Sequence, residues 1–300
     1  MPIHEQGYRH YDGRRRGRIW RSVTIARSGI RLALKKRKLV AFVLLAVTPA
    51  IVLGVLIYLA SRMTEFIELA NRFMPHVPWK ELVGENVTVA AVWKVIFSRF
   101  LMWQLIPVGV IVTFVGPELI SQDLRVRALQ LYFSRPLTRI DYVLGKLVVV
   151  AVFVAMITLA PALLLYLVGV VLSRSITVVG ETYPTLIAVF AGYLLITLVG
   201  GVLVLACSSM SRRSPYVAAV WGMLVILSDV AYGLVGDAMA ARWAHLLSIR
   251  ANVVQVLARL FGVKPAYDFV WWPSLIILGA LVAAALVVIF RRLRSLEGEH

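Results

Sequence analysis

The sequence predicts an all-α polytopic membrane protein with six transmembrane helices. The chain has 300 residues, of which 60% are hydrophobic, whereas soluble domains are roughly half apolar. Six apolar stretches are long enough to cross a hydrocarbon core, which takes about 20 helical residues. They follow one another too closely to leave room for a separate globular domain. We therefore expect a single membrane domain over residues 18–300, preceded by a short tail.

The predicted spans are defined by where charged residues stop and resume. At a rise of about 1.5 Å per residue, about 20 residues cover a core of about 30 Å. The longer runs can tilt or include a turn at the interface. The spans cover approximately residues 39–60, 100–118, 143–173, 185–211, 214–236 and 270–291.

The first 38 residues hold 12 lysines and arginines. Residues 1–17 have no apolar period, so we expect a disordered basic cytoplasmic tail there. In residues 19–34 apolar side chains recur at helical spacing with arginines on the other faces, which indicates an interfacial elbow helix on the inner leaflet. Clustered positive charge can indicate a nucleic-acid partner. Here the charge follows the membrane topology, so no nucleic acid is expected as a partner.

The distribution of positive charge orients the six spans. With a cytoplasmic N-terminus, the inside segments hold 22 of the 32 lysines and arginines, with seven acidic residues. The outside segments hold the other ten, and eight acidic residues lie on that side when Asp229 of the fifth span is included. Cytoplasmic loops of membrane proteins carry the excess of lysine and arginine. The sequence therefore predicts a multi-pass protein of the plasma (inner) membrane with both termini in the cytoplasm.

Two outside segments are predicted to contain helices and not only bare loops. In residues 61–99 the apolar positions indicate two short amphipathic helices on either side of a break at Pro75 and Pro78. In residues 243–261 another apolar face ends just before Gly262. This second pattern indicates a surface or re-entrant helix pair before the sixth span.

Small residues in the fourth span predict close helix packing. Gly192, Gly200, Gly201 and Ala206 let a neighbouring helix approach the backbone. The neighbour is either another helix of this chain or a second copy. We favour packing within the chain.

Motifs that the sequence lacks exclude several enzyme classes. No G-x-x-x-x-G-K-[ST] loop is present, so the chain is not expected to bind ATP phosphates itself. The five histidines lack zinc-site spacing, and no G-x-S-x-G elbow or facing pair of carboxylates occurs. The one cysteine, Cys207, cannot form a disulfide within the chain. We expect a protein that is not catalytic by itself and holds no cofactor or metal.

Residues 117–146 join the second and third predicted spans and are amphipathic. Apolar residues recur at helical spacing at Leu124, Ala128 and Leu131, while polar residues occupy the other positions. The pattern predicts a short polar-faced helix that ends before Pro136, because a proline cannot continue it. A helix of this kind between two spans offers a surface to a partner in the water phase.

This segment resembles the matching region of the membrane subunits of type-2 ABC exporters. Those subunits carry an acidic residue at the end of the second span and then a short cytoplasmic coupling helix. A Ser/Thr-Pro turn with a basic residue follows, and a Gly-Lys pair opens the third span. In this chain the elements are Glu118, residues 121–133, Ser134-Arg135-Pro136 and Gly145-Lys146.

The resemblance implies that a separate ATPase docks on this segment. Its arginines would pair with acidic residues in a cleft of the ATPase, and its apolar side chains would fill a pocket there. Basic residues in a short cytoplasmic loop also follow from topology alone, so both interpretations stay open. The residues assigned to docking are Glu118, Gln122, Asp123, Arg125, Arg127, Leu129, Phe133, Arg135 and Arg139.

The sequence departs from the family pattern just before the expected coupling helix. Family members often show an acidic-basic pair followed by Gly-Thr, whereas residues 123–125 are followed here by Val126-Arg127-Ala128. The geometry of this turn is therefore open. Glu118 either accepts from backbone amides at a helix N-terminus, where a carboxylate is favoured, or is a boundary residue among lipid headgroups.

By resemblance the chain is the permease subunit of an ABC transporter complex. It would move an unidentified substrate across the lipid bilayer using ATP hydrolysed by partner subunits, which hold the ATP and magnesium. Two copies, or this chain and a similar one, would form a homodimer or heterodimer. One alternative is a non-transporting membrane scaffold or sensor that recruits cytoplasmic partners through its basic N-terminus.

Asp229 is the carboxylate that lies deepest within a predicted span. Counted from Ser214, it falls in the outer half of the membrane. Charged residues at this depth usually face a pathway or a partner. Asp229 therefore either lines a translocation path or reaches the outer interface, and an ion-coupled carrier that uses it is a third functional alternative.

Overall fold

The computed structural model describes residues 18–60, 89–128, 138–173, 177–239 and 243–297, and these ranges contain no strand. Six stretches within them are long and apolar enough to cross a membrane, which confirms the predicted all-α architecture with six spans. The helices are α1 (Arg18–Leu34), α2 (Arg37–Ala60), α5 (Val89–Arg125), α7 (Arg139–Ile157), α8 (Leu159–Ser173), α9 (Thr177–Met210), α10 (Ser214–Met239), η1 (Ala244–Leu247), α11 (Ile249–Phe261) and α12 (Trp272–Glu297). The predicted tail, residues 1–17, lies outside the described residues.

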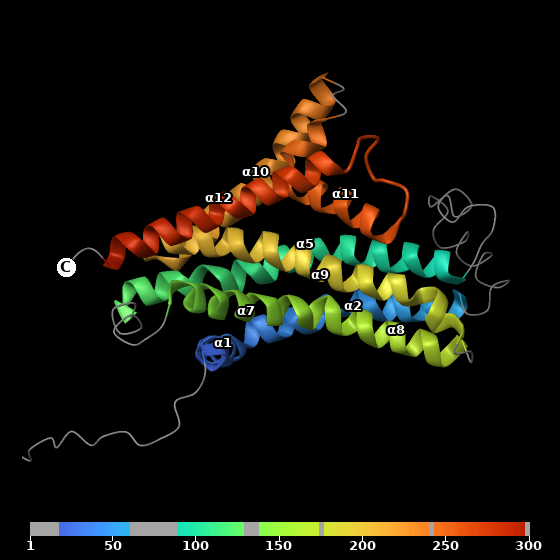
Figure 1. Ribbon diagram of the computed structural model, residues 1–300, viewed down its shortest axis with the longest axis horizontal. Helices are drawn as coiled ribbons and strands as arrows, with labels where there is room; N and C mark the ends of the chain where they lie inside the picture. Colours follow the sequence, from blue (N-terminus) through green and yellow to red (C-terminus); the bar gives the residue numbers. More distant parts are fainter. Residues whose placement is uncertain (1–17, 61–88, 129–137, 174–176, 240–242, 298–300) are drawn as a thin grey trace, which may run out of the picture.

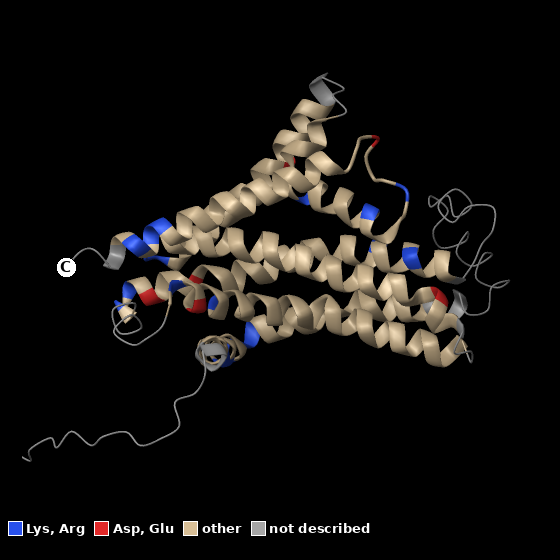
Figure 2. Ribbon diagram, in the orientation of Figure 1, with Lys and Arg blue, Asp and Glu red and all other residues tan. Residues whose placement is uncertain are grey.

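The helices form a bundle in which α5 and α9 run side by side through the middle (Figure 1). α2, α7 and α8 lie on one side of this pair, and α10, α11 and α12 lie on the other. Charged residues gather towards the two ends of the bundle, and most of its length is uncharged (Figure 2). This distribution fits helices whose middle parts lie in lipid, where a charge is expensive.

Glycines allow the two central helices to approach closely. A Cβ atom on Gly116 of α5 would lie 2.4 Å from Val204 of α9, and one on Gly192 would lie 2.6 Å from Leu101. Only a residue without a side chain fits at such distances. Gly201 makes the same kind of contact with α7, where a Cβ would lie 2.6 Å from the nearest side chain. The expectation that small residues of the fourth span pack within the chain is confirmed at Gly192 and Gly201.

The third span consists of two helices. α7 ends at Ile157, and α8 begins at Leu159 after a single intervening residue, Thr158. Pro161 has no N–H to donate to the carbonyl of Ile157, and the Thr158 hydroxyl donates to the carbonyl of Val154 at 2.7 Å. The proline therefore interrupts the helix inside the span that was predicted as one run.

α5 begins at Val89, well before the predicted start of the second span. The separate outer helix expected around Phe97 is instead the first part of α5, so that expectation was wrong. No glycine or proline lies between Val89 and the predicted span, and the helix therefore continues past Lys94 and Arg99. The other expected outer helix, with its break at the two prolines, lies outside the described residues.

α1 packs across α7 and is seen end-on in Figure 1. A Cβ on Gly29 would lie 2.8 Å from Val149, and one on Gly145 would lie 3.1 Å from the carbonyl oxygen of Ser22, so both glycines make the contact close. The Ser22 hydroxyl also donates to the backbone carbonyl of Asp141 at 2.9 Å. A helix is thus present where the elbow helix was expected, and its position on the inner leaflet stays a prediction.

η1 and α11 form the helix pair that was predicted before the sixth span. The Ser248 hydroxyl accepts from the backbone N–H of Ala251 at 2.9 Å and caps the start of α11. Gly262 ends this helix with a φ of 65°, a left-handed conformation that glycine adopts without strain. Because α11 packs against α5, α9, α10 and α12, this segment is part of the bundle.

Candidate functional site

The end of the bundle that carries the segment 118–139 is predicted to face the cytoplasm, and we call it the inner end. Here α9 holds α5 through one serine. The Ser208 hydroxyl donates to the carbonyl of Pro117 at 2.8 Å and accepts from the N–H groups of Ile120 and Ser121, each at 3.0 Å. A side chain inserted into the backbone hydrogen bonds of a helix is a known cause of bending. Ser208 therefore helps to set the direction in which α5 leaves the bundle.

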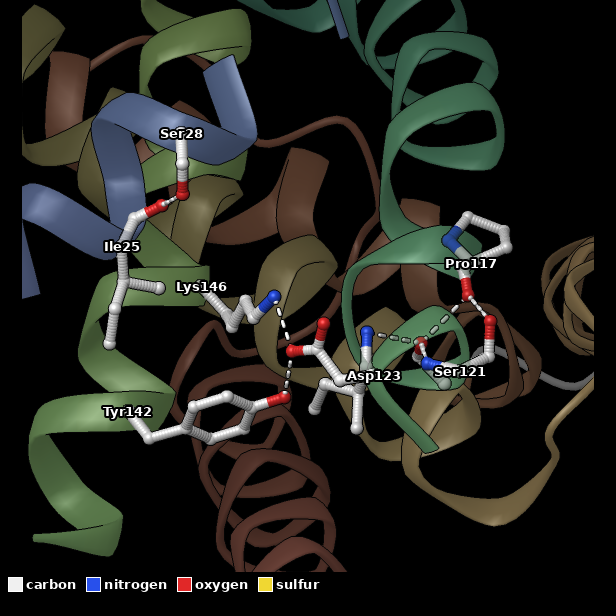
Figure 3. A network of polar contacts seen from close by, with 9 residues as sticks. Ile25, Ser28, Pro117, Ser121, Asp123, Tyr142 and Lys146 are labelled. Carbon is white, nitrogen blue, oxygen red and sulfur yellow. Dashed lines mark hydrogen bonds and ion pairs between the residues drawn. The ribbon is translucent and has the colours of Figure 1, made fainter. Parts of the chain in front are cut away.

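A buried ion pair joins α5 to α7 at the same end. Oδ2 of Asp123 accepts from Nζ of Lys146 at 2.7 Å and from the hydroxyl of Tyr142 at 2.7 Å, as Figure 3 shows. All three residues are buried, with 9%, 7% and 0% of their surface exposed. A buried charge is stable only where a partner and hydrogen bonds compensate it. Both kinds of compensation are present, and together they fix α5 against α7.

Glu118 ties α5 to the corner between α1 and α2. Its carboxylate accepts a hydrogen bond from Lys36, the residue that precedes α2. Both side chains are 40% exposed, so the ion pair is screened and adds little to stability. The expected contact with amides at a helix N-terminus is not found among the described residues, because α5 continues past Glu118 to Arg125.

α7 begins with a capping box. The Thr138 hydroxyl accepts from the backbone N–H of Asp141 at 3.2 Å, and Oδ2 of Asp141 accepts from the N–H of Thr138 at 3.2 Å. These two bonds satisfy N–H groups that have no partner inside the helix. The described residues on the two sides of residues 129–137 are therefore held in place, by the ion pairs of α5 and by this cap.

The predicted docking residues fall into three groups. The two acidic residues, Glu118 and Asp123, pair with lysines of the same chain. Four others are exposed or half-buried next to the loop: Gln122, Arg125, Arg127 and Arg139. Three lie outside the described residues: Leu129, Phe133 and Arg135. Residues 121–125 of the expected coupling helix are the end of α5, and the part from residue 129 onward is outside the described ranges, so that helix stays a prediction.

Asp229 belongs to a third ion pair, far from this loop in the sequence. Oδ2 of Asp229 accepts from Nε of Arg250 on α11 at 2.9 Å, and Oδ1 accepts from the Ser248 hydroxyl. The hydrogen bond to Asp229 raises the pKa of the Arg250 guanidinium, so this side of the pair stays charged at any physiological pH. The pair lines a cavity of about 610 Å³ between α5, α9, α10 and α11.

Within the described residues, no three His, Cys, Asp or Glu side chains gather as metal ligands.

Comparison with known protein families gives a match that extends over most of the chain. The model of the family described as "ABC-2 family transporter protein" matches residues 23–293. The chain belongs to the ABC-2 transporter family. No curated protein sequence matches the chain. The matched range contains five of the six spans, nearly all of the sixth, and both lysine-carboxylate pairs of the inner end, so the protein is a multi-pass membrane component of an ABC transporter.

In this ABC-2 transporter the turn after α5 has a backbone conformation that glycine favours. Arg127 has a φ of 54°, in the left-handed region. Outside glycine this conformation costs about 1–3 kcal/mol. Family members often show Gly-Thr in this turn, and this chain lacks it. The left-handed conformation that suits a glycine nevertheless occurs here, at Arg127.

Sequence reasoning missed the partners that hold the predicted residues of this ABC-2 transporter in place. Lys146 carried a signal, because a lone charge within an apolar run needs a partner. Its pairing with Asp123 still required the fold. Ser208 and Lys36 carried none, since a serine in a span and a lysine at its boundary are common. Arg250 was hidden within a segment that was recognised only by its apolar face.

Proposed function

We propose that this ABC-2 transporter is the permease subunit of an ABC exporter. Separate ATPase subunits, which hold ATP and magnesium, dock on residues 118–139. Closure of the ATPases on ATP pushes on this segment and switches the spans between inward and outward access. The observation that supports the proposal is that the end of α5, just before this loop, is held to α7, to α9 and to the residue that precedes α2.

These clamps explain how a push on the loop reaches the spans. The Asp123–Lys146 pair connects α5 with α7, Ser208 connects it with α9, and the Glu118–Lys36 pair connects it with the start of α2. Breaking a buried ion pair costs about 3–5 kcal/mol. A force on the loop therefore moves these helices together before it detaches α5 from them.

The side chains at the turn suit an acidic cleft with an apolar floor. Arg125 and Arg127 are exposed, and Val126 between them is 61% exposed. A guanidinium binds carboxylates with two parallel hydrogen bonds and keeps its charge at all relevant pH values. Two such groups flanking an apolar residue support docking on a protein surface that offers carboxylates around a pocket.

One face of α10 supports the assembly of two permeases. Six of the seven large exposed apolar side chains described on it recur at spacings of three and four residues and form one stripe: Tyr216, Val220, Met223, Leu227, Val230 and Leu234. This spacing is typical of a seam between two helices. A second copy, or a similar permease, would cover the stripe and form a homodimer or heterodimer.

The positions of the charges support a cytoplasmic inner end in the plasma membrane. Figure 2 shows basic residues at the C-terminal end of α12 on the same side of the bundle as the start of α7. α1, whose last turn carries Arg31, packs close to this end. With positive charge retained on the cytoplasmic side, both termini lie in the cytoplasm.

Asp229 is then in the outer half of the bundle, where we place it on the translocation path.

The test of ATPase docking is a double substitution in the turn, Arg127→Glu with Leu129→Glu. It is made in the full chain, expressed together with the ATPase subunit that co-purifies with the unmodified chain. Charge reversal and loss of the apolar contact should lower the amount of ATPase that co-purifies by about tenfold or more, because one truncated charge pair at an interface costs about 2–5 kcal/mol. Insertion into the membrane should not change.

The matched control is Arg259→Glu with Leu260→Glu. This Arg-Leu pair is exposed on α11 and is predicted to face the other side of the membrane. The control should leave co-purification intact. If the turn variant still co-purifies with its ATPase and transports as the unmodified chain does, residues 118–139 are not the docking site.

A further inference from the structure

The cavity next to Asp229 has the composition of a site for a molecule with a long apolar part. Its volume of about 610 Å³ falls within the range of small-molecule pockets, about 300–1,000 Å³. Apolar side chains such as Val108, Ile196 and Ile226 form most of its walls. Gly109 and Gly222 widen it, since a Cβ on either glycine would meet no atom within 4 Å.

Among the residues that line the cavity, the hydroxyl group is that of Thr113, and it already donates a hydrogen bond. Thr113 donates to the carbonyl of Gly109 at 2.8 Å, within its own helix. Among the lining residues, Asp229 and Arg250 are the charged ones, and they form one ion pair. A ligand of the cavity therefore meets apolar surface along most of its length and a single charged place.

At that place the lining offers donors and no unused carboxylate oxygen. Both oxygens of Asp229 accept hydrogen bonds, from the Ser248 hydroxyl and from Nε of Arg250. A guanidinium has five N–H donors, and the bond to Asp229 is the one that the described residues make with Arg250. The Arg250 side chain is 42% exposed, so its outer nitrogens are accessible. A matching headgroup must supply acceptor oxygens, and a negative charge on them strengthens the bonds.

We infer that this cavity binds an anionic lipid of the bilayer, with an acyl chain against the apolar walls and a phosphate or carboxylate on Arg250. The inference deepens the proposed function, on which it rests for the idea that the ligand is carried across the membrane. The binding step itself needs no ATPase. A neutral apolar molecule fits less well, because it would cover the accessible outer nitrogens of Arg250 without offering them an acceptor.

The experiment uses the purified full-length chain and a phosphatidic acid with a photoreactive group on its acyl chain. A diacylglycerol with the same chain is the reference probe without a phosphate. Phosphatidic acid should crosslink to peptides of α5 and α10 around Gly109 and Gly222, and diacylglycerol should do so much less. Mass spectrometry of the digested protein reads the position and yield of each crosslink.

Two kinds of variant separate the apolar and the charged part of the site. Gly222→Leu fills the cavity and should lower the yield by about tenfold or more, the usual effect of a mismatch of a few carbon atoms in an apolar pocket. Gly109→Leu does the same from α5, in case the first variant does not fold. Arg250→Gln, together with Asp229→Asn so that no unpaired carboxylate remains, should lower the yield of phosphatidic acid by about tenfold, the effect of one charge-assisted hydrogen bond.

The controls lie off the cavity. Gly279→Leu places the same side chain on α12 at another glycine whose Cβ position is open, and Arg259→Gln removes another charge of α11. Both should keep the crosslink. Equal yields for Gly222→Leu and Gly279→Leu, or for the two lipids, would overturn the inference, as would crosslinks at Gly222 to a second copy of the chain in place of lipid. If the unmodified chain docks its ATPase but shows no lipid crosslink, this inference alone is contradicted. If it crosslinks the lipid but docks no ATPase, the proposed function alone is contradicted.

Discussion

Asp123 is a carboxylate buried between two long helices at the inner end. Its charge is balanced by Lys146, and the Tyr142 hydroxyl adds a further hydrogen bond. Nζ of Lys146 also lies 5.4 Å from the centre of the Tyr142 ring, within the range of a cation–π contact. By contrast, the Glu118–Lys36 pair is well exposed, and such pairs contribute about 0–1 kcal/mol. Stability at this end should therefore depend on the first pair and far less on the second.

Lys146→Met is predicted to destabilise the fold by about 3–5 kcal/mol, because it leaves the buried Asp123 carboxylate without its counter-charge. Adding Asp123→Leu should restore most of the loss, since an apolar pair of similar volume replaces the buried charges. The midpoint of thermal unfolding in detergent measures both effects. A double variant that is as unstable as the single one would show that the two side chains do not act as a pair.

At the scale of secondary-structure elements, the bundle depends on places where one helix backbone touches a neighbour. Gly116 on α5 faces Val204 on α9, and a Cβ there would lie 2.4 Å from the valine side chain. Valine cannot turn away easily, because its branched side chain keeps one rotamer in most helical positions. This contact lies one residue from Pro117, whose carbonyl accepts from Ser208. The spacing between α5 and α9 is thus fixed next to the loop that a partner is proposed to move.

Gly116→Ala is expected to destabilise the protein by about 1–3 kcal/mol, the usual cost of overpacking. Gly279→Ala, on α12, is the matched control. Its Cβ would meet no atom within 4 Å, so it should be neutral or stabilise by up to about 1 kcal/mol through the higher helix propensity of alanine. Thermal unfolding of the two variants side by side measures the difference. Equal midpoints would mean that the close approach of α5 and α9 is not needed.

The helices themselves could largely be predicted from the sequence, because apolar runs of membrane length are a strong signal. Their ends were less predictable. The start of α5 was missed, since charges at Lys94 and Arg99 look like a membrane boundary although they do not stop a helix. The break at Thr158 was missed because it lies inside one uncharged run. The ion pairs of the site could not be predicted, as their members come from different helices and no local pattern links Asp123 with Lys146.

At the scale of the whole molecule, two charged sites lie on opposite sides of the same central helix pair. At the inner end α5 is clamped to α7 and α9, and farther along the bundle α5 and α9 form part of the wall of the cavity at Asp229. α5 is one helix over 37 residues, although Pro107 and Pro117 lie within it. In the proposed mechanism, a displacement of its inner end would move the cavity wall as well. The same helix would then connect the proposed ATPase docking site with the proposed lipid site.

The most direct test of this arrangement is the accessibility of residue 134, in the loop between α5 and α7. Ser134→Cys is introduced together with Cys207→Ala, which removes the single native cysteine. A maleimide that cannot cross the membrane should label this cysteine in inside-out vesicles and not in intact cells, and binding of the ATPase should slow the labelling. Labelling from the outside of intact cells would contradict both the topology and the docking of an ATPase on residues 118–139.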